Sequence, residues 1–376
     1  MKLETLCIHG AKDNRNTTGA VTVPIYQTAT YAHPAVGEST GYDYSRVGNP
    51  TREALERLMT KLENGNDTFA FATGMAAISA LMELFVPDDH IIASDNLYGG
   101  SVRLFENISR KNGLVIDYVN TCDINLLKEK INTKTKAVFV ETPTNPMMRV
   151  TDIAAVRECI ADDVLLIVDN TFLTPYFQRP ISLGANIVVH SGTKYLGGHN
   201  DTLAGFLVVD RADIAERLHF IRKTTGACLS PFDSFLVIRG IKTLPLRMEK
   251  SQASSFVVAD WLLHHSKVKA VFYPGLPNHS DFAVSKKQAS GFGSILSFEV
   301  DNEQTAKQIL ERVKTIMYAE SLGGVESLMT YPVLQTHSDI SEETRNALGI
   351  HDRLLRLSVG IESTDDIIAD LEQSFS

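Results

Sequence analysis

The sequence of 376 residues contains few cysteines and no long apolar run, and both absences narrow the class of protein. Its four cysteines, at positions 7, 122, 159 and 228, are widely separated and form no C-x-x-C pair. This spacing gives no sign of a zinc site or a disulfide framework, so we expect free thiols in a reducing compartment. No uninterrupted apolar stretch approaches the roughly 18–20 residues that a membrane-spanning helix requires. We therefore predict no metal site and no membrane partner.

The chain also lacks clusters of basic residues. It carries 36 Lys and Arg against 45 Asp and Glu, which gives a net charge of −9. No segment has enough positive charge to follow a phosphate backbone, so we predict no nucleic-acid partner. The first residues, Met1 to Thr5, are not followed by the apolar segment of a secretory signal, and we expect a cytoplasmic protein.

What the sequence does contain is the composition of a large globular protein. Hydrophobic residues make up 44% and charged residues 22% of the chain. A chain of this length folds into roughly two or three domains with a large core. Residues 1–50 are rich in Thr, Gly, Asn, Tyr and Pro and show little helical periodicity, which predicts an extended arm. Such an arm needs another surface on which to lie.

Residues 51–240 show the pattern of an α/β domain. From residue 51 apolar side chains recur at three- and four-residue steps, which predicts a helix. Strands and helices then alternate, with a further helix expected over residues 102–111. Three short segments are almost wholly apolar, as in strands covered on both faces: 137–140, 165–168 and 187–189. We predict a large, mostly parallel sheet.

Residues 241–376 follow a different pattern. A long helical stretch at residues 246–265 precedes segments of alternating polarity such as 294–300 and 355–359. This pattern predicts a smaller α+β domain. No Gly/Ser linker separates it from the preceding residues, so we expect the two domains to share an interface. On the strand pattern alone, Arg356 is expected to face solvent.

Three segments of the α/β region carry candidate chemistry. Residues 73–75, Thr-Gly-Met, lie between a strand and a helix, where free backbone N–H groups and the helix dipole can bind an anion. Lys194 follows one apolar strand and Asp169 ends another, at the sheet edge where α/β proteins bind ligands. Each could also be an ordinary cap or a solvated turn residue. Together, a phosphate site, a lysine and a strand-end aspartate are the parts that a pyridoxal phosphate (PLP) enzyme requires.

Residues 191–199, with the sequence SGTKYLGGH, resemble the cofactor-lysine signature of the Cys/Met-metabolism family of PLP enzymes. Further segments resemble this family from near residue 5 to residue 370: YDYSRVGNPTR (42–52), YGG (98–100), ETPTNP (141–146), VDNTF (168–172) and AESLGG (319–324). The resemblance implies an α/β protein of the aspartate aminotransferase-like fold type I. In that fold a large, mostly parallel sheet domain precedes a smaller C-terminal α+β domain. The resemblance also implies PLP as the cofactor and small amino acids as substrates.

The resemblance implies roles for individual residues of the cofactor site. Lys194 would bind PLP covalently and carry protons to and from the substrate. Asp169 would pair with the pyridine nitrogen of PLP, and Tyr98 would stack on its ring. The phosphate group would be held by Gly74, Met75, Ser191 and Thr193.

Other matching residues lie outside the cofactor ring. Tyr44 and Arg46 in the arm would reach the phosphate bound by a neighbouring subunit, which gives the arm a partner. The family's usual assembly is a homotetramer made of two such dimers with shared active sites. Arg356 would bind the substrate α-carboxylate through its bidentate guanidinium, with Asn145 and Ser321 beside it.

Two positions narrow the reaction that the resemblance implies. Glu320 resembles the acidic residue of members that act at the γ-carbon, which argues against a cystathionine β-lyase. Gly100 stands where methionine γ-lyases usually carry a cysteine. The resemblance implies four catalytic residues in all, namely Lys194, Tyr98, Tyr44 and Glu320.

Two γ-reactions remain open. One is γ-replacement on an O-acylhomoserine, in which cysteine displaces the acyloxy group and forms cystathionine; the other is γ-elimination from cystathionine. Residues 197–201 and 328–337 are most similar to bacterial enzymes that use O-acetylhomoserine, so the resemblance favours replacement. Methionine γ-lyase and O-acetylhomoserine sulfhydrylase activities rank lower. A non-catalytic PLP-binding homologue is disfavoured because Lys194, Asp169 and Tyr98 are all present.

Overall fold

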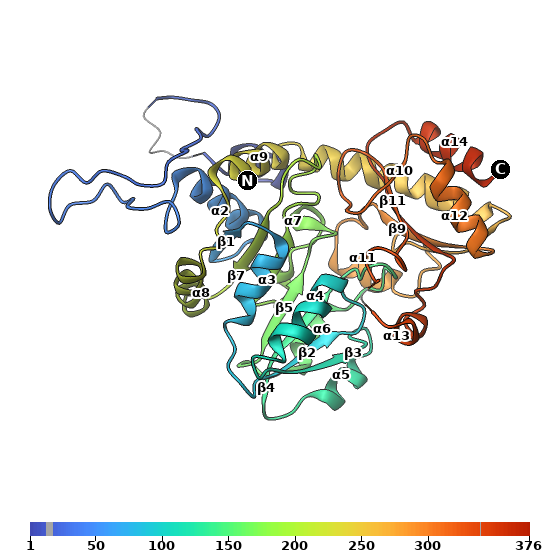
Figure 1. Cartoon of the computed structure of the whole chain (residues 1–376), viewed down its shortest axis with the longest axis horizontal. Coiled ribbons are helices and arrows are strands. Elements are labelled where there is room, and N and C mark those ends of the chain that lie inside the picture. The colour runs from blue at the N-terminus through green and yellow to red at the C-terminus, as the bar shows by residue number, and fades with distance from the viewer. Residues whose placement is uncertain (13–17, 339) are drawn as a thin grey trace.

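The structure is a computed structural model of the whole chain, and it describes residues 1–12, 18–338 and 340–376. Two β-sheets, one of seven strands and one of five, form the centres of the two halves of the molecule, and an arm projects from the N-terminal end (Figure 1). Among the described residues, no helix combines the length and the apolar character that a membrane crossing requires.

The larger sheet has the strand order β1-β7-β6-β5-β4-β2-β3. Strands β2 to β6 run parallel to one another, whereas β7 is antiparallel to both β1 and β6. The bounds of the strands are β1 Asp67–Phe71, β2 His90–Ser94, β3 Val115–Val119, β4 Thr135–Glu141, β5 Leu165–Asp169, β6 Ile187–Ser191 and β7 Gly205–Val209. The predicted mostly parallel sheet is confirmed, and β7 is a strand that the sequence analysis did not single out.

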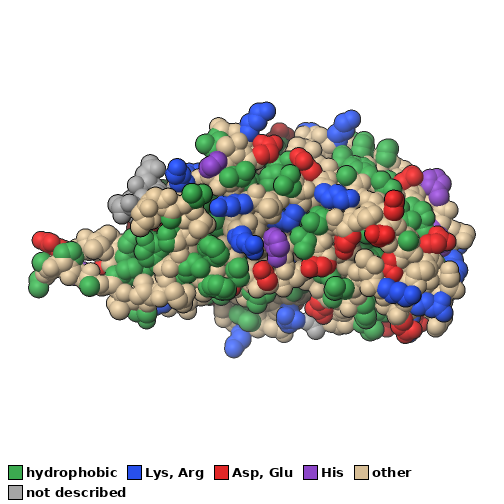
Figure 2. Space-filling model, turned by 90° about the horizontal axis from the view of Figure 1, so that it is seen from above, with side chains coloured by type: hydrophobic (Ala, Val, Ile, Leu, Met, Phe, Trp, Pro, Cys, Tyr) green, Lys and Arg blue, Asp and Glu red, His purple; other side chains and the backbone are tan. Residues whose placement is uncertain are grey.

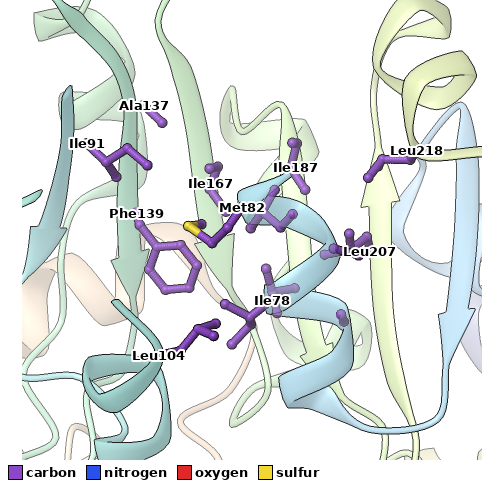
Figure 3. Packing of buried hydrophobic residues seen from close by; sticks show 14 of the residues in the cluster. Ile78, Met82, Ile91, Leu104, Ala137, Phe139, Ile167, Ile187, Leu207 and Leu218 are labelled. Carbon is purple, nitrogen blue, oxygen red and sulfur yellow. The ribbon is translucent and has the colours of Figure 1, made fainter. Parts of the chain in front are cut away.

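Both faces of this sheet are covered by helices, which explains the unbroken apolar runs in its strands. Successive strand residues point to opposite faces, so Phe139 and Ile167 pack on one side while Val138 and Leu166 pack on the other. Figure 3 shows the first side, where Ile78 and its helical neighbours lie against the strands. The covering helices are α3 (Gly74–Met82), α4 (Gly99–Leu104) and α8 (Ala212–Thr225) on that side, and α5 (Ile124–Lys130) and α6 (Ile153–Cys159) on the opposite side.

One predicted helix differs in detail. Residues 102–111 were expected to form a single α-helix, but α4 ends at Leu104 and a π-helical turn follows at Phe105–Ser109. The Arg110 N–H donates to the Phe105 carbonyl at 3.0 Å, an i to i−5 bond that the apolar periodicity did not reveal. Phe105 is fully buried against Phe139, so the wider turn places an aromatic ring in the core.

The N-terminal segment also differs from its prediction. Residues 1–50 were expected to be extended, yet Leu3–His9 form helix α1, which contacts α2 (Pro50–Glu63). Helix α1 spans only seven residues, too few for a helical period to stand out in the sequence. Beyond these helices, the same end of the molecule contains α7 (Thr174–Phe177), the short 3₁₀ turn Pro180–Leu183 and α9 (Pro231–Ile241).

The smaller sheet has the order β10-β11-β12-β9-β8 and is antiparallel except between β10 and β11. Its strands are β8 Val268–Phe272, β9 Ile295–Val300, β10 Met317–Tyr318, β11 Leu328–Thr330 and β12 Leu354–Ser358. Apolar residues of this sheet pack against α10 (Leu244–His264), α12 (Glu303–Arg312) and α14 (Thr364–Phe375). Two shorter helices, α11 (Phe282–Gln288) and α13 (Glu342–Ala347), complete this half.

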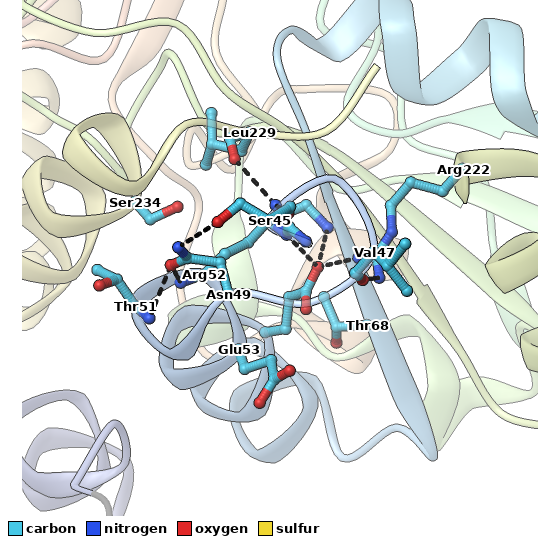
Figure 4. A network of polar contacts seen from close by, with 12 residues as sticks. Ser45, Val47, Asn49, Thr51, Arg52, Glu53, Thr68, Arg222, Leu229 and Ser234 are labelled. Atoms are coloured by element: carbon cyan, nitrogen blue, oxygen red, sulfur yellow. Dashed lines mark hydrogen bonds and ion pairs between the residues drawn. The ribbon is translucent and has the colours of Figure 1, made fainter. Parts of the chain in front are cut away.

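Residues 18–48 form an arm that is largely exposed, and hydrogen bonds at its base join it to the body. Val21 and Val36 are fully exposed, and hydrophobic side chains gather where the arm leaves the body (Figure 2). At the base, the buried Arg52 of α2 donates to the carbonyl of Ser45 at 2.7 Å, and Arg222 of α8 donates to that of Val47 at 3.4 Å (Figure 4). Two buried guanidinium groups therefore fix the direction in which the arm leaves the molecule.

Candidate active site

A cavity of about 220 Å³ lies at the carboxyl ends of β4, β5 and β6 and is bordered on its other side by residues of the C-terminal half. The parallel strands bring their ends to one edge, where α/β folds place ligands. All of the predicted site residues except Tyr44 and Arg46 of the arm line this cavity. These lining residues are Gly74, Met75, Tyr98, Asn145, Asp169, Ser191, Thr193, Lys194, Glu320, Ser321 and Arg356. Residues from distant parts of the chain are thus brought together as predicted.

The turn before α3 has the features of an anion site. Thr73 caps the helix, since its hydroxyl accepts the N–H of Ala76 at 2.9 Å, and the first backbone N–H groups remain directed outward. The turn packs closely against β6 and β7: a Cβ on Gly74 would lie 3.2 Å from that of Ser191, and one on Gly205 only 2.1 Å from the Thr73 carbonyl oxygen. Glycine is therefore needed at residue 205 for the turn to lie so near Ser191.

Asp169 ends β5 with its carboxylate at the cavity. Thr171 donates both its hydroxyl, at 2.6 Å, and its backbone N–H, at 3.0 Å, to Oδ1 of Asp169. Burial raises the pKa of this carboxyl, although the Thr171 hydrogen bonds act to lower it. Both of these hydrogen bonds involve Oδ1, which leaves Oδ2 available for a donor in the cavity. Thr171 was not predicted as a site residue.

Lys194 follows β6, and its amine donates to the hydroxyl of Ser321 at 2.7 Å. Burial, together with the positive charge of Arg356, lowers the pKa of Lys194 to about 8, while the Glu320 carboxylate acts to raise it. A substantial fraction of the amine is therefore neutral near physiological pH, as a nucleophile or general base requires.

Arg356 on β12 is buried, which corrects the expectation from its strand pattern that it would face solvent. It is 1% exposed, because the second face of the smaller sheet is turned toward the cavity rather than toward water. Its guanidinium donates to Asn145 Oδ1 at 2.9 Å, to the Ser321 carbonyl at 2.8 Å and to Thr330 Oγ1 at 2.9 Å. These partners are all neutral, and burial lowers the pKa of Arg356 to about 10. Its Nε has no hydrogen-bond partner, so the group fits an incoming carboxylate.

Tyr98 lies at the start of α4 and presents its ring to the cavity, 41% exposed. A Cβ on Gly100 would lie 2.4 Å from Cε1 of this ring, so the ring position depends on glycine there. The backbone N–H of Tyr98 donates to the carboxyl of Glu141 at 3.0 Å. An aromatic face held in this way can stack on a planar ring bound between it and the sheet edge.

Tyr44 and Arg46 do not line the cavity of their own chain. Both belong to the exposed arm, where Arg46 lies near the Tyr44 ring and donates to the backbone carbonyl of Lys223 at the end of α8. Their predicted role requires a second subunit. That role remains a prediction.

The sequence analysis missed two polar residues of the cavity besides Thr171, namely Glu141 and Thr336. Glu141 begins the segment ETPTNP, and its position at the end of an apolar strand could have identified it in the same way as Asp169. Thr336 gave no comparable signal, because it reaches the cavity from a loop whose course the sequence pattern does not reveal.

The residues present fit PLP. A phosphate fits the N–H groups at α3 with the hydroxyls of Ser191 and Thr193, and Asp169 can accept a ring N–H. Lys194 supplies an amine of lowered pKa for the aldehyde. Among the described residues, no cluster of three or more His, Cys, Asp or Glu side chains could hold a metal ion.

Comparison with known proteins gives one consistent family. Residues 4–376 match the model of the family described as Cys/Met metabolism PLP-dependent enzyme. A cystathionine gamma-lyase of Bacillus subtilis (strain 168) is 46% identical over 100% of this chain and 99% of its own length. A cystathionine gamma-synthase of Haemophilus influenzae (strain ATCC 51907 / DSM 11121 / KW20 / Rd) is 45% identical, covering 100% and 98%. A cystathionine beta-lyase of Lactococcus lactis subsp. cremoris (strain MG1363) is 46% identical, covering 99% and 98%.

The fold is equally well matched. The crystal structure of a cystathionine gamma-lyase from Lactobacillus plantarum complexed with L-serine superposes with a TM-score of 0.96. It is 43% identical in sequence, and the match covers 100% of this chain and 98% of that one. The similar proteins thus share one fold and one cofactor chemistry while carrying three different reaction names.

Proposed function

The chain belongs to the Cys/Met metabolism family of PLP-dependent enzymes, and from this premise we propose that it is a cystathionine γ-synthase. As a member of the family it is a PLP-dependent transferase or lyase. The proposed reaction replaces the acyloxy group at Cγ of an O-acylhomoserine by the sulfur of cysteine, and the preferred substrate is O-acetylhomoserine. The γ-lyase, γ-synthase and β-lyase relatives described above are 45–46% identical to this chain, so overall identity does not separate these reactions.

The arrangement of Lys194, Ser321 and Glu320 carries the proposal of γ-chemistry. The Lys194 amine donates to Ser321 Oγ, and Glu320, the neighbour of Ser321, raises the pKa of that amine. A reaction at the γ-carbon requires protons to be moved at two substrate carbons, Cα and Cβ, whereas a β-elimination requires proton removal only at Cα. One flexible amine facing a carboxylate supports this longer sequence.

The chemistry divides between cofactor and chain. When bound, PLP supplies an electron sink that stabilises negative charge at the substrate's Cα. Lys194 removes the proton from Cα and then from Cβ, since its long side chain can reach neighbouring atoms and its lowered pKa makes the neutral amine more available than in a solvated lysine. Departure of the acyloxy group from Cγ as a carboxylate, and addition of the cysteine thiolate to the same carbon, then exchange a C–O bond for a C–S bond.

Arg356 orients the substrate in this proposal. Its buried guanidinium lacks an anionic hydrogen-bond partner and has an unpaired Nε, so a substrate α-carboxylate would supply the missing charge. Asn145 fixes one edge of the guanidinium, and the Ser321 carbonyl fixes another. The carboxylate is then held on the side of the cavity away from the phosphate turn, which leaves Cα near Lys194.

The choice between synthesis and elimination rests on two segments of sequence. Residues 328–337 are most similar to acetylhomoserine-using enzymes, and this segment reaches the cavity through Thr336. A difference in substrate choice can therefore act through its contact with the bound acyl or thiol group. The close fit between Gly100 and the Tyr98 ring also disfavours a methionine γ-lyase, in which a cysteine at this position would require the ring to move.

We further propose a homotetramer of two dimers with shared active sites, in the cytoplasm. The exposed apolar residues of the arm support association, because Val21 and Val36 are fully exposed and Tyr44 is 46% exposed. The arm would lie on a second subunit and bring Tyr44 and Arg46 to the phosphate turn there. The division into an arm, an α/β domain at 51–240 and a C-terminal domain at 241–376 belongs to the same proposal.

The reaction is tested by a side-by-side product assay. Purified protein is incubated with O-acetylhomoserine plus cysteine, and separately with cystathionine alone, and the products are identified by mass spectrometry. Rapid cystathionine formation in the first mixture with little 2-oxobutanoate in the second supports the synthase. Rapid 2-oxobutanoate from cystathionine with little synthesis identifies a γ-lyase instead, and pyruvate from cystathionine identifies a β-lyase.

A further inference from the structure

Glu141 lies beside Asp169 at the edge of the sheet. The two residues are register partners on the parallel strands β4 and β5, so their side chains point to the same face. Glu141 is 6% exposed, and both carboxyl groups line the same cavity. Two carboxylates so placed repel each other and are poorly solvated, which favours a state in which only one is ionised.

The carboxyl of Glu141 is also a junction between two cavity residues. Its Oε2 accepts the backbone N–H of Tyr98 at 3.0 Å, and its Oε1 accepts the backbone N–H of Asn145 at 3.0 Å. Tyr98 presents its ring to the cavity, and Asn145 holds the guanidinium of Arg356. Glu141 thus positions both the stacking residue and the amide next to the substrate carboxylate.

Charged and hydrogen-bonding groups around the pair act on both carboxyl groups. Burial and the neighbouring Asp169 raise the pKa of Glu141, against which the two backbone N–H donors and Arg356 on β12 act more weakly. The pKa of Asp169 is also raised by burial, but Thr171 and the charge of His190 on β6 act to lower it. The other charged side chains that line this cavity among the described residues are those of Lys194 and Glu320.

We propose that Glu141 and Asp169 form a carboxyl pair that holds one proton in the cofactor-free chain and gives it up when PLP binds. When PLP is bound, its protonated pyridine nitrogen places a positive charge beside Asp169. This charge offsets the repulsion between the two carboxylates, which the shared proton relieves in the cofactor-free chain. The proton leaves the Glu141 oxygen and passes to solvent, with no other bond changed. Ionised Glu141 then accepts its two backbone N–H groups more strongly and tightens the positions of Tyr98 and Asn145.

The proposal rests on the PLP site and is independent of whether the chain is a synthase or a lyase. Its direct test is the number of protons released when the full chain, stripped of cofactor, is refilled with PLP. Titration calorimetry in two buffers of different ionisation enthalpy measures this number for the wild type, for Glu141→Gln and for the control Glu303→Gln on the exposed face of α12. Proton changes at Lys194 and on PLP itself are common to all three and cancel in the comparison.

The expected result has a definite sign. At about pH 7 the wild type and Glu303→Gln release about one proton more than Glu141→Gln, because a raised pKa means that the pair is still protonated there. At about pH 10 the pair is ionised even without PLP, so the difference disappears. Equal proton counts for wild type and Glu141→Gln at about pH 7, with PLP bound by both, overturn the proposal.

A second measurement covers a Glu141→Gln variant that fails to fold or to take up PLP. Infrared difference spectra of the wild type with and without PLP report the carbonyl stretch of a protonated carboxyl, and ¹³C-labelled glutamate shifts that band if it belongs to a glutamate. We expect a labelled band in the cofactor-free chain that is lost on refilling. Its absence in the cofactor-free chain overturns the proposal, whereas failure of the wild type to bind PLP would contradict the cofactor site itself.

Discussion

The two walls of the cavity are built differently. The sheet wall, formed by residues 73–75, Glu141, Asp169 and 191–194, consists of strand ends and one helix start. The C-terminal wall, formed by Glu320, Ser321, Thr336 and Arg356, is made mostly of loop residues, and only Arg356 lies on a regular strand. Ser321 has a positive φ of 86°, which a non-glycine residue adopts only when its surroundings hold it there.

This difference in construction suggests a division of roles, in which the sheet wall binds the cofactor and the C-terminal wall selects the substrate. Strand ends and helix starts provide fixed N–H groups and carboxylates, which suit a cofactor that every member binds. Loops can change shape and side chain without disturbing the sheet, which suits a choice among substrates. We therefore expect changes in the sheet wall to abolish chemistry or cofactor binding, and changes in the C-terminal wall to alter substrate use.

The largest expected effect comes from the sheet wall. Lys194→Ala removes the group that forms the covalent link to PLP and moves protons, so turnover should fall by at least about 10⁴-fold. The measurement is cystathionine formation, together with the absorbance of covalently bound PLP. Lys269→Ala, on an exposed position of β8, is the matched control and should leave both unchanged. Turnover retained by Lys194→Ala would refute the assignment of the lysine.

A change in the C-terminal wall should leave the cofactor in place. Arg356→Lys keeps a positive charge but loses the planar fork, so we expect kcat/KM for O-acetylhomoserine to fall by about 10²-fold, mainly through KM. PLP content should stay equal to that of the wild type. Arg353→Lys, next to β12 and paired with Glu299, is the control. Loss of PLP from Arg356→Lys would show that the two walls are not separable.

The arm provides a smaller test, because it belongs to neither wall of its own chain. If Arg46 reaches the phosphate of a second subunit, Arg46→Ala should weaken PLP retention by about tenfold, the effect of losing one charge-assisted hydrogen bond. Dialysis against PLP-free buffer followed by measurement of residual cofactor tests this. Arg217→Ala, an exposed arginine of α8, should retain PLP like the wild type. Equal retention by both variants would remove Arg46 from the site.

The smallest expected effect concerns the electrostatic interaction between Glu320 of the C-terminal wall and Lys194 of the sheet wall. Glu320 raises the pKa of Lys194, which lies at about 8. Glu320→Gln removes that negative charge, so the Lys194 amine should lose its proton at lower pH, and the inflection in the rate of PLP capture by the cofactor-free chain should move to lower pH. Glu326→Gln, an acidic residue outside the cavity lining, should leave the inflection in place. An inflection shifted upward or unmoved in Glu320→Gln contradicts the coupling.

The sequence predicted the sheet wall better than the C-terminal wall. Asp169 and Lys194 follow apolar strands, and strand ends of a parallel sheet necessarily meet at one edge, so their approach follows from local pattern alone. Arg356 was expected in solvent, because alternation within β12 shows that two faces exist but not that the second face borders a cavity. Only the family resemblance assigned it to the site.

The fold shows the same limit. The parallel strands with unbroken apolar runs were predicted, whereas the seven-residue α1 and the π-helical turn at Phe105–Ser109 were not. Helix α1 is stabilised by packing against α2 and the π-turn by burial of Phe105, and neither contact is visible in a local pattern. Thr336 belongs to the same class, since only the folded course of its loop brings it to the cavity.

The central claim is that Lys194 moves protons at two carbons of the substrate. Its most direct test is to run the reaction with O-acetylhomoserine and cysteine in D₂O and to locate deuterium in the product by mass spectrometry and NMR. The γ-replacement proposed here predicts cystathionine that carries deuterium at both Cα and Cβ of its homoserine-derived half. Cystathionine labelled at Cα alone, or formed without any deuterium, would contradict the claim.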